Sequence, residues 1–297
     1  LSRSFFIFAL MFVTLVLLTS IASADGVETI FITDEIDITN FPDISLSFRA
    51  VDSNNKVPNI LTNEDIVLYE NGQPTTNYAV GPPIAGPVTV IFVIDLNQVA
   101  NFSGSVGNAV RESLIHFTDG YFRDGIDTVA VLARVGNVDG DETVVLLEPT
   151  QSVSQFTSAV NSFDLQPTGR TEGLLGVSDA LTQLARMVEP GHAGTAVIYI
   201  SRLVEWPQQS IAVRNAQNLA ALGREQYVKL YSFHTDANYD EPLRVLSAQT
   251  ENGYLPLTAV QNNSSQLSQI YQSIMAQGIS YTLNYRSQIG ALGPRTV

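Results

Sequence analysis

The run from Val88 to Ile94 constrains the fold of this 297-residue chain more than any other stretch. Every residue in it is apolar or β-branched, and an acidic residue, Asp95, follows directly. Such a run is typical of a strand buried on both faces, as in the centre of a parallel α/β sheet. Open α/β sheets bind ligands at the carboxyl ends of their strands. We therefore expect Asp95 to lie at a ligand-binding edge.

Helix and strand patterns alternate after this run. Further strands are expected at 127–132, 143–147, 196–200, 228–233 and 253–257, and helices at 106–117, 152–163, 172–188, 208–222, 242–249 and 265–277. This alternation predicts a doubly wound, mostly parallel α/β sheet with helices on both faces, because parallel strands need crossover connections.

A smaller all-β module is expected before the sheet. Residues 27–80 show alternating strand patterns, and Asn71-Gly72 is a strong hairpin signal. The segment 81–87, rich in Pro and Gly, is expected to be a stiff linker. We predict an immunoglobulin-like module at 25–84, the α/β domain at 85–279, and a strand within 280–297 that returns to the module.

The N-terminus indicates secretion. Residues 4–22 carry no charge and are mostly apolar, and Ala22-Ser23-Ala24 has the small-residue spacing of a signal-peptidase site, so we expect residues 1–24 to be removed. The alternative is an uncleaved anchor formed by residues 4–22. Either leader predicts a secreted, extracellular or periplasmic location. Because the chain begins on Leu and ends on ALGPRTV, we expect a fragment of a longer protein.

Composition excludes several classes of function. The formal net charge of -14 argues against binding nucleic acid or an anionic membrane surface. The absence of Cys excludes disulfides and thiolate metal sites, and the three His residues lack zinc-ligand spacing. Known catalytic and nucleotide-binding motifs are missing, so a hydrolase is the weakest alternative and no enzyme is expected.

The first strand and loop, with residues 95–99 reading DLNQV, resemble the von Willebrand factor type A (VWA) domain of bacterial secreted proteins. The resemblance covers residues 88–277 and implies that 143–147 is an antiparallel edge strand. The family binds a divalent ion through Asp-x-Ser-x-Ser, a Thr and a second Asp. Here Asp95 matches, and Asn97 and Val99 replace the two Ser residues. Thr171 is either the matching Thr or only the N-cap of the helix that follows it, a position that Thr favours.

The second Asp of the metal site is also replaced. After the strand at 196–200, Arg202 stands where the resemblance places that Asp. A guanidinium about 5 Å from a divalent ion would repel it by roughly 6 to 7 kcal/mol at an effective dielectric constant of about 20. We expect no metal cofactor, and Arg202 either pairs with Asp95 or points to solvent. The alternative is a reduced magnesium or calcium site of Asp95, Asn97 and Thr171.

These observations predict a protein-binding module of the adhesion type that works without metal. Its partner-binding face is expected to contain Asp95, Asn97, Thr171 and Arg202. Metal-dependent adhesion through the reduced site is the alternative.

Overall fold

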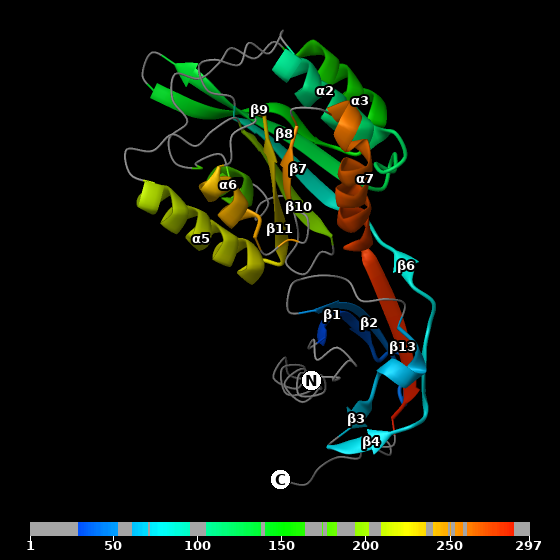
Figure 1. Ribbon diagram of the computed structural model, residues 1–297. Helices are drawn as coiled ribbons and strands as arrows, with labels where there is room; N and C mark the ends of the chain where they lie inside the picture. The colour runs from blue at the N-terminus through cyan, green and yellow to red at the C-terminus, as the bar shows by residue number, and fades with distance from the viewer. Residues whose placement is uncertain are drawn as a thin grey trace, which may run out of the picture. The chain divides into compact units, whose positions relative to one another are not determined.

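A computed structural model describes residues 29–52, 61–70, 72–95, 105–137, 140–163, 174, 177–182, 194–201, 209–235, 240–248, 250, 253–257 and 260–287. These residues form two compact units. Unit 1 contains the described residues up to Ala85 and those from Ile279 onward, and unit 2 contains those from Gly86 to Gly278. Figure 1 shows both units with their helices and strands labelled.

Unit 2 is built on a six-stranded sheet with the order β12-β11-β10-β7-β8-β9. The strands are β7 (Thr89–Asp95), β8 (Thr128–Asn137), β9 (Gly140–Thr150), β10 (Thr195–Ser201), β11 (Val228–His234) and β12 (Tyr254–Pro256). All neighbouring pairs are parallel except β8 with β9, which is antiparallel and lies at the edge. The predicted α/β fold class and the antiparallel edge strand are confirmed.

Helices cover both faces of this sheet (Figure 1). The helices are α2 (Ser105–Thr118), α3 (Val153–Ser162), α5 (Gln209–Glu225), α6 (Glu241–Leu246) and α7 (Val260–Ala276). The first core, between the sheet and α2, α3 and α7, contains Phe92 and Phe156. The second core lies under α5, α6 and the helical residues 177–182.

The central strand β7 explains why residues 90–94 are all apolar. Its side chains alternate between the two cores, with Phe92 in the first and Ile91 and Val93 in the second. The Phe92 ring lies 5.8 Å from the Phe156 ring and 5.6 Å from the Phe117 ring, measured between centroids. A strand with a core on each face has no position that favours a polar side chain.

Two helices differ from their predicted ends. Helix α6 ends at Leu246, because Ser247 leaves the helical conformation and caps it, whereas the sequence pattern predicted residue 249. Helix α7 begins at Val260, five residues before the predicted start, in a polar stretch that has no apolar periodicity to reveal it. Of the helix predicted at 172–188, residues 177–182 are described and are helical.

Unit 1 is all β. Its strands are β1 (Thr29–Asp37), β2 (Asp43–Asp52), β3 (Leu68–Glu70), β4 (Gln73–Thr75), β5 (Tyr78–Val80), β6 (Ile84–Ala85) and β13 (Ile279–Arg286). The main sheet has the order β1-β2-β13-β5, with β6 also paired to β13, and β3 pairs with β4. The β3–β4 hairpin at the predicted turn is confirmed, and Gly72 has the positive φ of +75° that such a turn favours.

The segment 81–87 is not a simple linker. Its residues Ile84 and Ala85 form β6, which pairs with β13. The backbone N–H of Gly81 donates to the carbonyl of Thr282 at 2.7 Å, and that of Gly86 donates to Gly278 at 2.7 Å. Pro and Gly predicted a break in helical structure, but extended backbone of this kind can also hydrogen-bond to a neighbouring strand.

The predicted leader, residues 1–24, lies outside the described residues. Within the part of the chain that the structure describes, no helix is both long enough and apolar enough to cross a membrane.

Candidate functional site

Four polar side chains lie in one row across neighbouring strands of unit 2. Three of them end β7, β10 and β11, and the fourth, Arg134, lies within β8, which continues to Asn137. Asp95 of β7 is in register with Ser201 of β10, which is in register with His234 of β11. On the other side of β7, the parallel pairing with β8 ends at Ile94 and Ala133. The next residues along the two strands are Asp95 and Arg134. Arg134, Asp95, Ser201 and His234, here called the polar row, share the sheet face that bears the second core.

The polar row is buried. The exposed fractions are 6% for Arg134, 1% for Asp95, 0% for Ser201 and 1% for His234. Charged groups are rarely buried unless other polar groups compensate them. The contacts of these side chains therefore determine what the row can do.

Asp95 is held by a tyrosine. Tyr199, also on β10, donates its hydroxyl proton to Oδ2 of Asp95 over 2.5 Å, and both side chains are buried. Burial raises the pKa of Tyr199 well above its usual value, the negative charge of Asp95 raises it further, and the positive charge of Arg134 opposes this. Tyr199 therefore stays protonated and remains a hydrogen-bond donor to the carboxylate.

Arg134 is fixed by neighbours on the other side of the row. Its Nη1 donates to Oγ1 of Thr143 on β9 at 3.0 Å. The Thr143 hydroxyl in turn donates to Oδ2 of Asp179, in the helical segment 177–182. A buried guanidinium is thus held on the same face as Asp95.

His234 ends the row next to α6. Its Nδ1 lies 3.0 Å from the hydroxyl of Tyr254 on β12. Asp240 caps α6, because its Oδ1 accepts a hydrogen bond of 2.9 Å from the backbone N–H of Leu243. The Tyr254 hydroxyl also lies 3.5 Å from the backbone nitrogen of Asp240. His234 is thereby connected to the start of α6.

The order of the row does not suit hydrolysis. A Ser-His-Asp triad needs His between the nucleophile and the acid, so that it can take the serine proton while the acid orients it. Here Ser201 lies between Asp95 and His234, and it is fully buried. The residues fit a buried polar layer of the sheet better than a nucleophilic centre.

Among the residues that the structure describes, no group of three or more His, Asp or Glu side chains is placed to hold a metal ion. Asp95 already accepts the hydrogen bond from Tyr199, and the polar row adds a guanidinium, which repels a cation. Of the predicted site residues, Asp95 lies at the strand end, while Asn97, Thr171 and Arg202 lie outside the described residues.

Sequence reasoning missed Tyr199, Arg134, Ser201 and His234 as parts of this site. For Arg134, Ser201 and His234 the signal was the position directly after a run of buried strand residues, whereas Tyr199 lies within β10 and gave no such signal. Arg134 follows the apolar run that begins at Val129, and His234 follows the run that begins at Val228. Parallel strands end at the same edge, so comparing these strand-terminal residues would have brought the row together.

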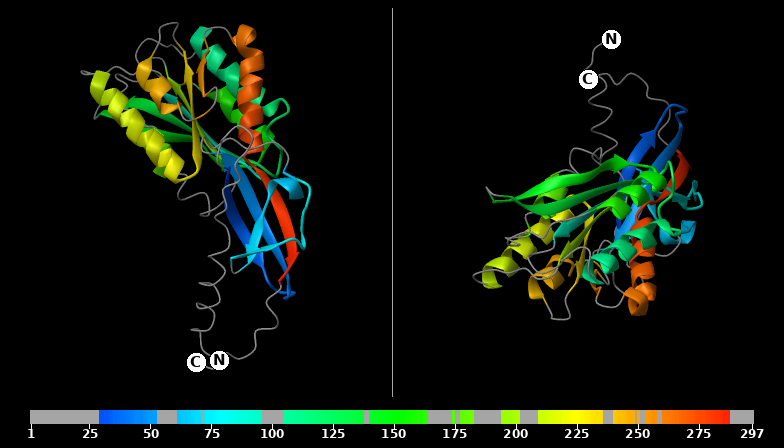
Figure 2. Two further views of the ribbon diagram at one scale, coloured as in Figure 1. Left: turned by 60° about the horizontal axis from the view of Figure 1, so that its bottom comes forward. Right: turned by 90° about the horizontal axis from the view of Figure 1, so that it is seen from above.

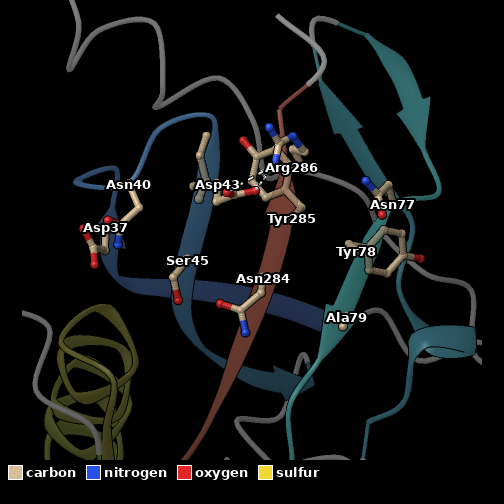
Figure 3. Close-up of a pocket in the computed structure, with 11 residues that line it drawn as sticks. Asp37, Asn40, Asp43, Ser45, Asn77, Tyr78, Ala79, Asn284, Tyr285 and Arg286 are labelled. Atoms are coloured by element: carbon tan, nitrogen blue, oxygen red, sulfur yellow. Dashed lines mark hydrogen bonds and ion pairs between the residues drawn. The ribbon is translucent and has the colours of Figure 1, made fainter.

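Unit 1 contains an open polar cavity of about 530 Å³ (Figure 3). It is lined by Asp37, Asn40, Asp43, Ile44, Ser45, Asn77, Tyr78, Ala79, Asn284, Tyr285 and Arg286. Arg286 and Asp43, which are register partners on the neighbouring strands β13 and β2, form an ion pair of 3.3 Å in its lining, with both side chains about 60% exposed. A pair this exposed contributes less than about 1 kcal/mol.

No protein-family model matches the chain, and no curated protein sequence matches it. Among solved structures, it is similar to proximal thread matrix protein 1 from the mussel byssus, solved with a zinc-occupied MIDAS motif. The identity is 11% and the TM-score 0.48, with 70% of this chain and 50% of that chain covered.

Two bacterial structures are also similar. The vWF domain of the type V pili tip protein Mfa5 from Porphyromonas gingivalis has 11% identity and a TM-score of 0.45, with 64% of this chain and 96% of that chain covered. The pilus adhesin SpaC from Lactobacillus rhamnosus GG has 10% identity and a TM-score of 0.48, with 83% and 34% covered. The chain thus spans half of the thread matrix protein and about a third of SpaC. At such low similarity, function must be argued from this chain's own residues.

Proposed function

We propose that this chain is an extracellular, non-enzymatic protein-binding module of VWA type, which contacts its partner without a divalent ion. The observation that carries the proposal is the buried hydrogen bond from Tyr199 to Asp95, beside the guanidinium of Arg134. In this arrangement the protein itself supplies a hydrogen-bond donor and a positive charge at the strand ends.

The same contacts argue against the reduced metal site. A divalent ion needs oxygen ligands whose lone pairs face it. Tyr199 directs its proton at one oxygen of Asp95, and replacing that contact with an ion would leave the Tyr199 hydroxyl buried without its acceptor. We propose that Asn97, Thr171 and Arg202, on the segments that follow or flank these strands, contact the partner protein.

Extracellular action is supported by the predicted leader at residues 1–24. A protein partner is favoured over nucleic acid by the formal net charge of -14. The absence of a triad order in the polar row supports a binding role over hydrolysis.

The proposal is tested by binding of the immobilised chain to biotinylated surface proteins of its native host. We expect equal binding in EDTA and in magnesium. Arg202→Glu should weaken this binding, because it reverses a charge on the proposed face. The matched control is Arg224→Glu, which reverses an exposed charge in the last turn of α5, before β11 begins. Loss of binding in EDTA, or equal weakening by both variants, would contradict the proposal.

A further inference from the structure

Strand β9 forms one edge of the unit 2 sheet. It runs from Gly140 to Thr150 and, within the described part of the chain, pairs with β8 alone. Figure 2 shows it in green at the side of the sheet. An edge strand presents backbone N–H and C=O groups that another extended segment can pair with.

The composition of β9 does not protect this edge at its centre. The strand contains no Lys or Arg, and Val144, Val145, Leu146 and Leu147 follow one another in its middle. Val145 is 39% exposed. Natural edge strands are commonly protected by Lys, by Pro or by charges that point inward. Here the only proline, Pro149, stands next to the end of the strand.

Acidic side chains flank the apolar centre. Glu142 lies on one side and Glu148 on the other, and both are exposed. If a second copy of the chain paired antiparallel about Val145, Glu142 of each copy would face Glu148 of the other. Like charges directly opposite each other destabilise a sheet. The charges therefore disfavour self-pairing and favour an incoming segment with basic residues.

We infer that β9 accepts an extended segment of a partner protein as an added antiparallel strand, with an apolar centre between two basic residues. Main-chain hydrogen bonds would give this contact its affinity, and the charges facing Glu142 and Glu148 its specificity. The register between β8 and β9 shifts twice. One shift lies between Val131 and Leu132, where β9 has an extra residue, Leu146, between Glu142 and Glu148; the other lies between Val129 and Val131, where the extra residue of β9 falls between Leu147 and Thr150. A regular incoming strand should therefore place its basic residues one position closer together than Glu142 and Glu148.

This inference concerns the sheet edge and does not depend on the function proposed above. The probe is the fluorescein-labelled peptide Lys-Val-Thr-Val-Thr-Lys, blocked at its C-terminus, with binding to the full chain measured by fluorescence anisotropy. The comparison peptides are Glu-Val-Thr-Val-Thr-Glu and Lys-Val-Pro-Val-Thr-Lys, whose proline removes a backbone donor. We expect the basic peptide to bind about tenfold more tightly than the acidic one, from two cross-strand charge pairs.

The double variant Glu142→Lys/Glu148→Lys should reverse this preference, and the proline peptide should bind neither protein. An unchanged preference in the double variant would overturn the inference, as would failure of the basic peptide to bind the wild type. If the proline peptide bound the wild type as tightly as the basic peptide does, charge attraction alone would explain the binding, and this result would also overturn the inference. Sedimentation that reveals a wild-type dimer lost in Val145→Lys, which would place two lysines opposite each other in such a self-pair, would assign the edge to a second copy instead.

Discussion

Replacing Asp127 with alanine is expected to lower the free energy of unfolding by about 3 kcal/mol. The Asp127 side chain is 1% exposed and accepts hydrogen bonds from Arg123 Nε at 2.9 Å and Nη2 at 2.6 Å. It also accepts from the backbone N–H of Val88 at 3.0 Å, directly before β7. Removing the carboxylate leaves these donors without their acceptor, beside the central strand. Urea unfolding followed by circular dichroism measures the loss.

The control is Arg286→Ala in unit 1. It removes one partner of the ion pair with Asp43, in which both side chains are about 60% exposed, so the expected cost is below about 1 kcal/mol. If Asp127→Ala lowered the free energy of unfolding no more than Arg286→Ala, the buried Arg123–Asp127 pair would stabilise the fold no more than an exposed pair does. That result would contradict the prediction.

Replacing Tyr199 with phenylalanine is expected to cost about 2 kcal/mol at neutral pH. The substitution keeps the ring but removes a buried hydrogen bond to a charged group, and such bonds contribute about 1.5–3 kcal/mol. The matched control is Tyr227→Phe, since Tyr227 is 49% exposed, and its cost should be close to zero. Thermal or urea unfolding of the two variants separates these results.

The two variants should also differ in alkaline solution. The folded pKa of Tyr199 is raised by burial and by the charge of Asp95, whereas the unfolded pKa is about 10. Above pH about 10, the unfolded chain loses this proton and the folded chain keeps it, so stability falls as pH rises. Tyr199→Phe should show a shallower fall than the wild type, and Tyr227→Phe the same fall. Equal slopes in all three proteins would contradict the buried Tyr199–Asp95 contact.

The fold of unit 2 could be predicted because its strands and helices carry strong periodic signals. Val110, Leu114 and Phe117 on α2, and Phe156 and Val160 on α3, have helical spacing and are buried as that spacing predicts. The end of α6 and the start of α7 were predicted less accurately. A helix cap ends α6 and a polar turn begins α7, and neither leaves an apolar pattern in the sequence. The strand pairing within 81–87 was missed because Pro and Gly report on helix breaking and give no information about a distant partner strand.

The candidate site could be predicted only at Asp95. Its position followed from one apolar run, but the contact with Tyr199 depends on the register of two strands that lie 104 residues apart along the chain. Arg134 and His234 likewise reach the site only through strand order. The roles of Asn97, Thr171 and Arg202 stay predictions.

The central claim is that the protein supplies its own charge and hydrogen bond at Asp95 and needs no divalent ion. The most direct measurement is the melting temperature with and without millimolar magnesium, calcium or zinc. The positive control is the double variant Val99→Ser/Arg202→Asp, which restores two oxygen ligands and should be stabilised by the ion through linkage. We expect no shift for the wild type. A rise in the wild-type melting temperature that disappears in Asp95→Ala would contradict the claim and establish metal binding at this site.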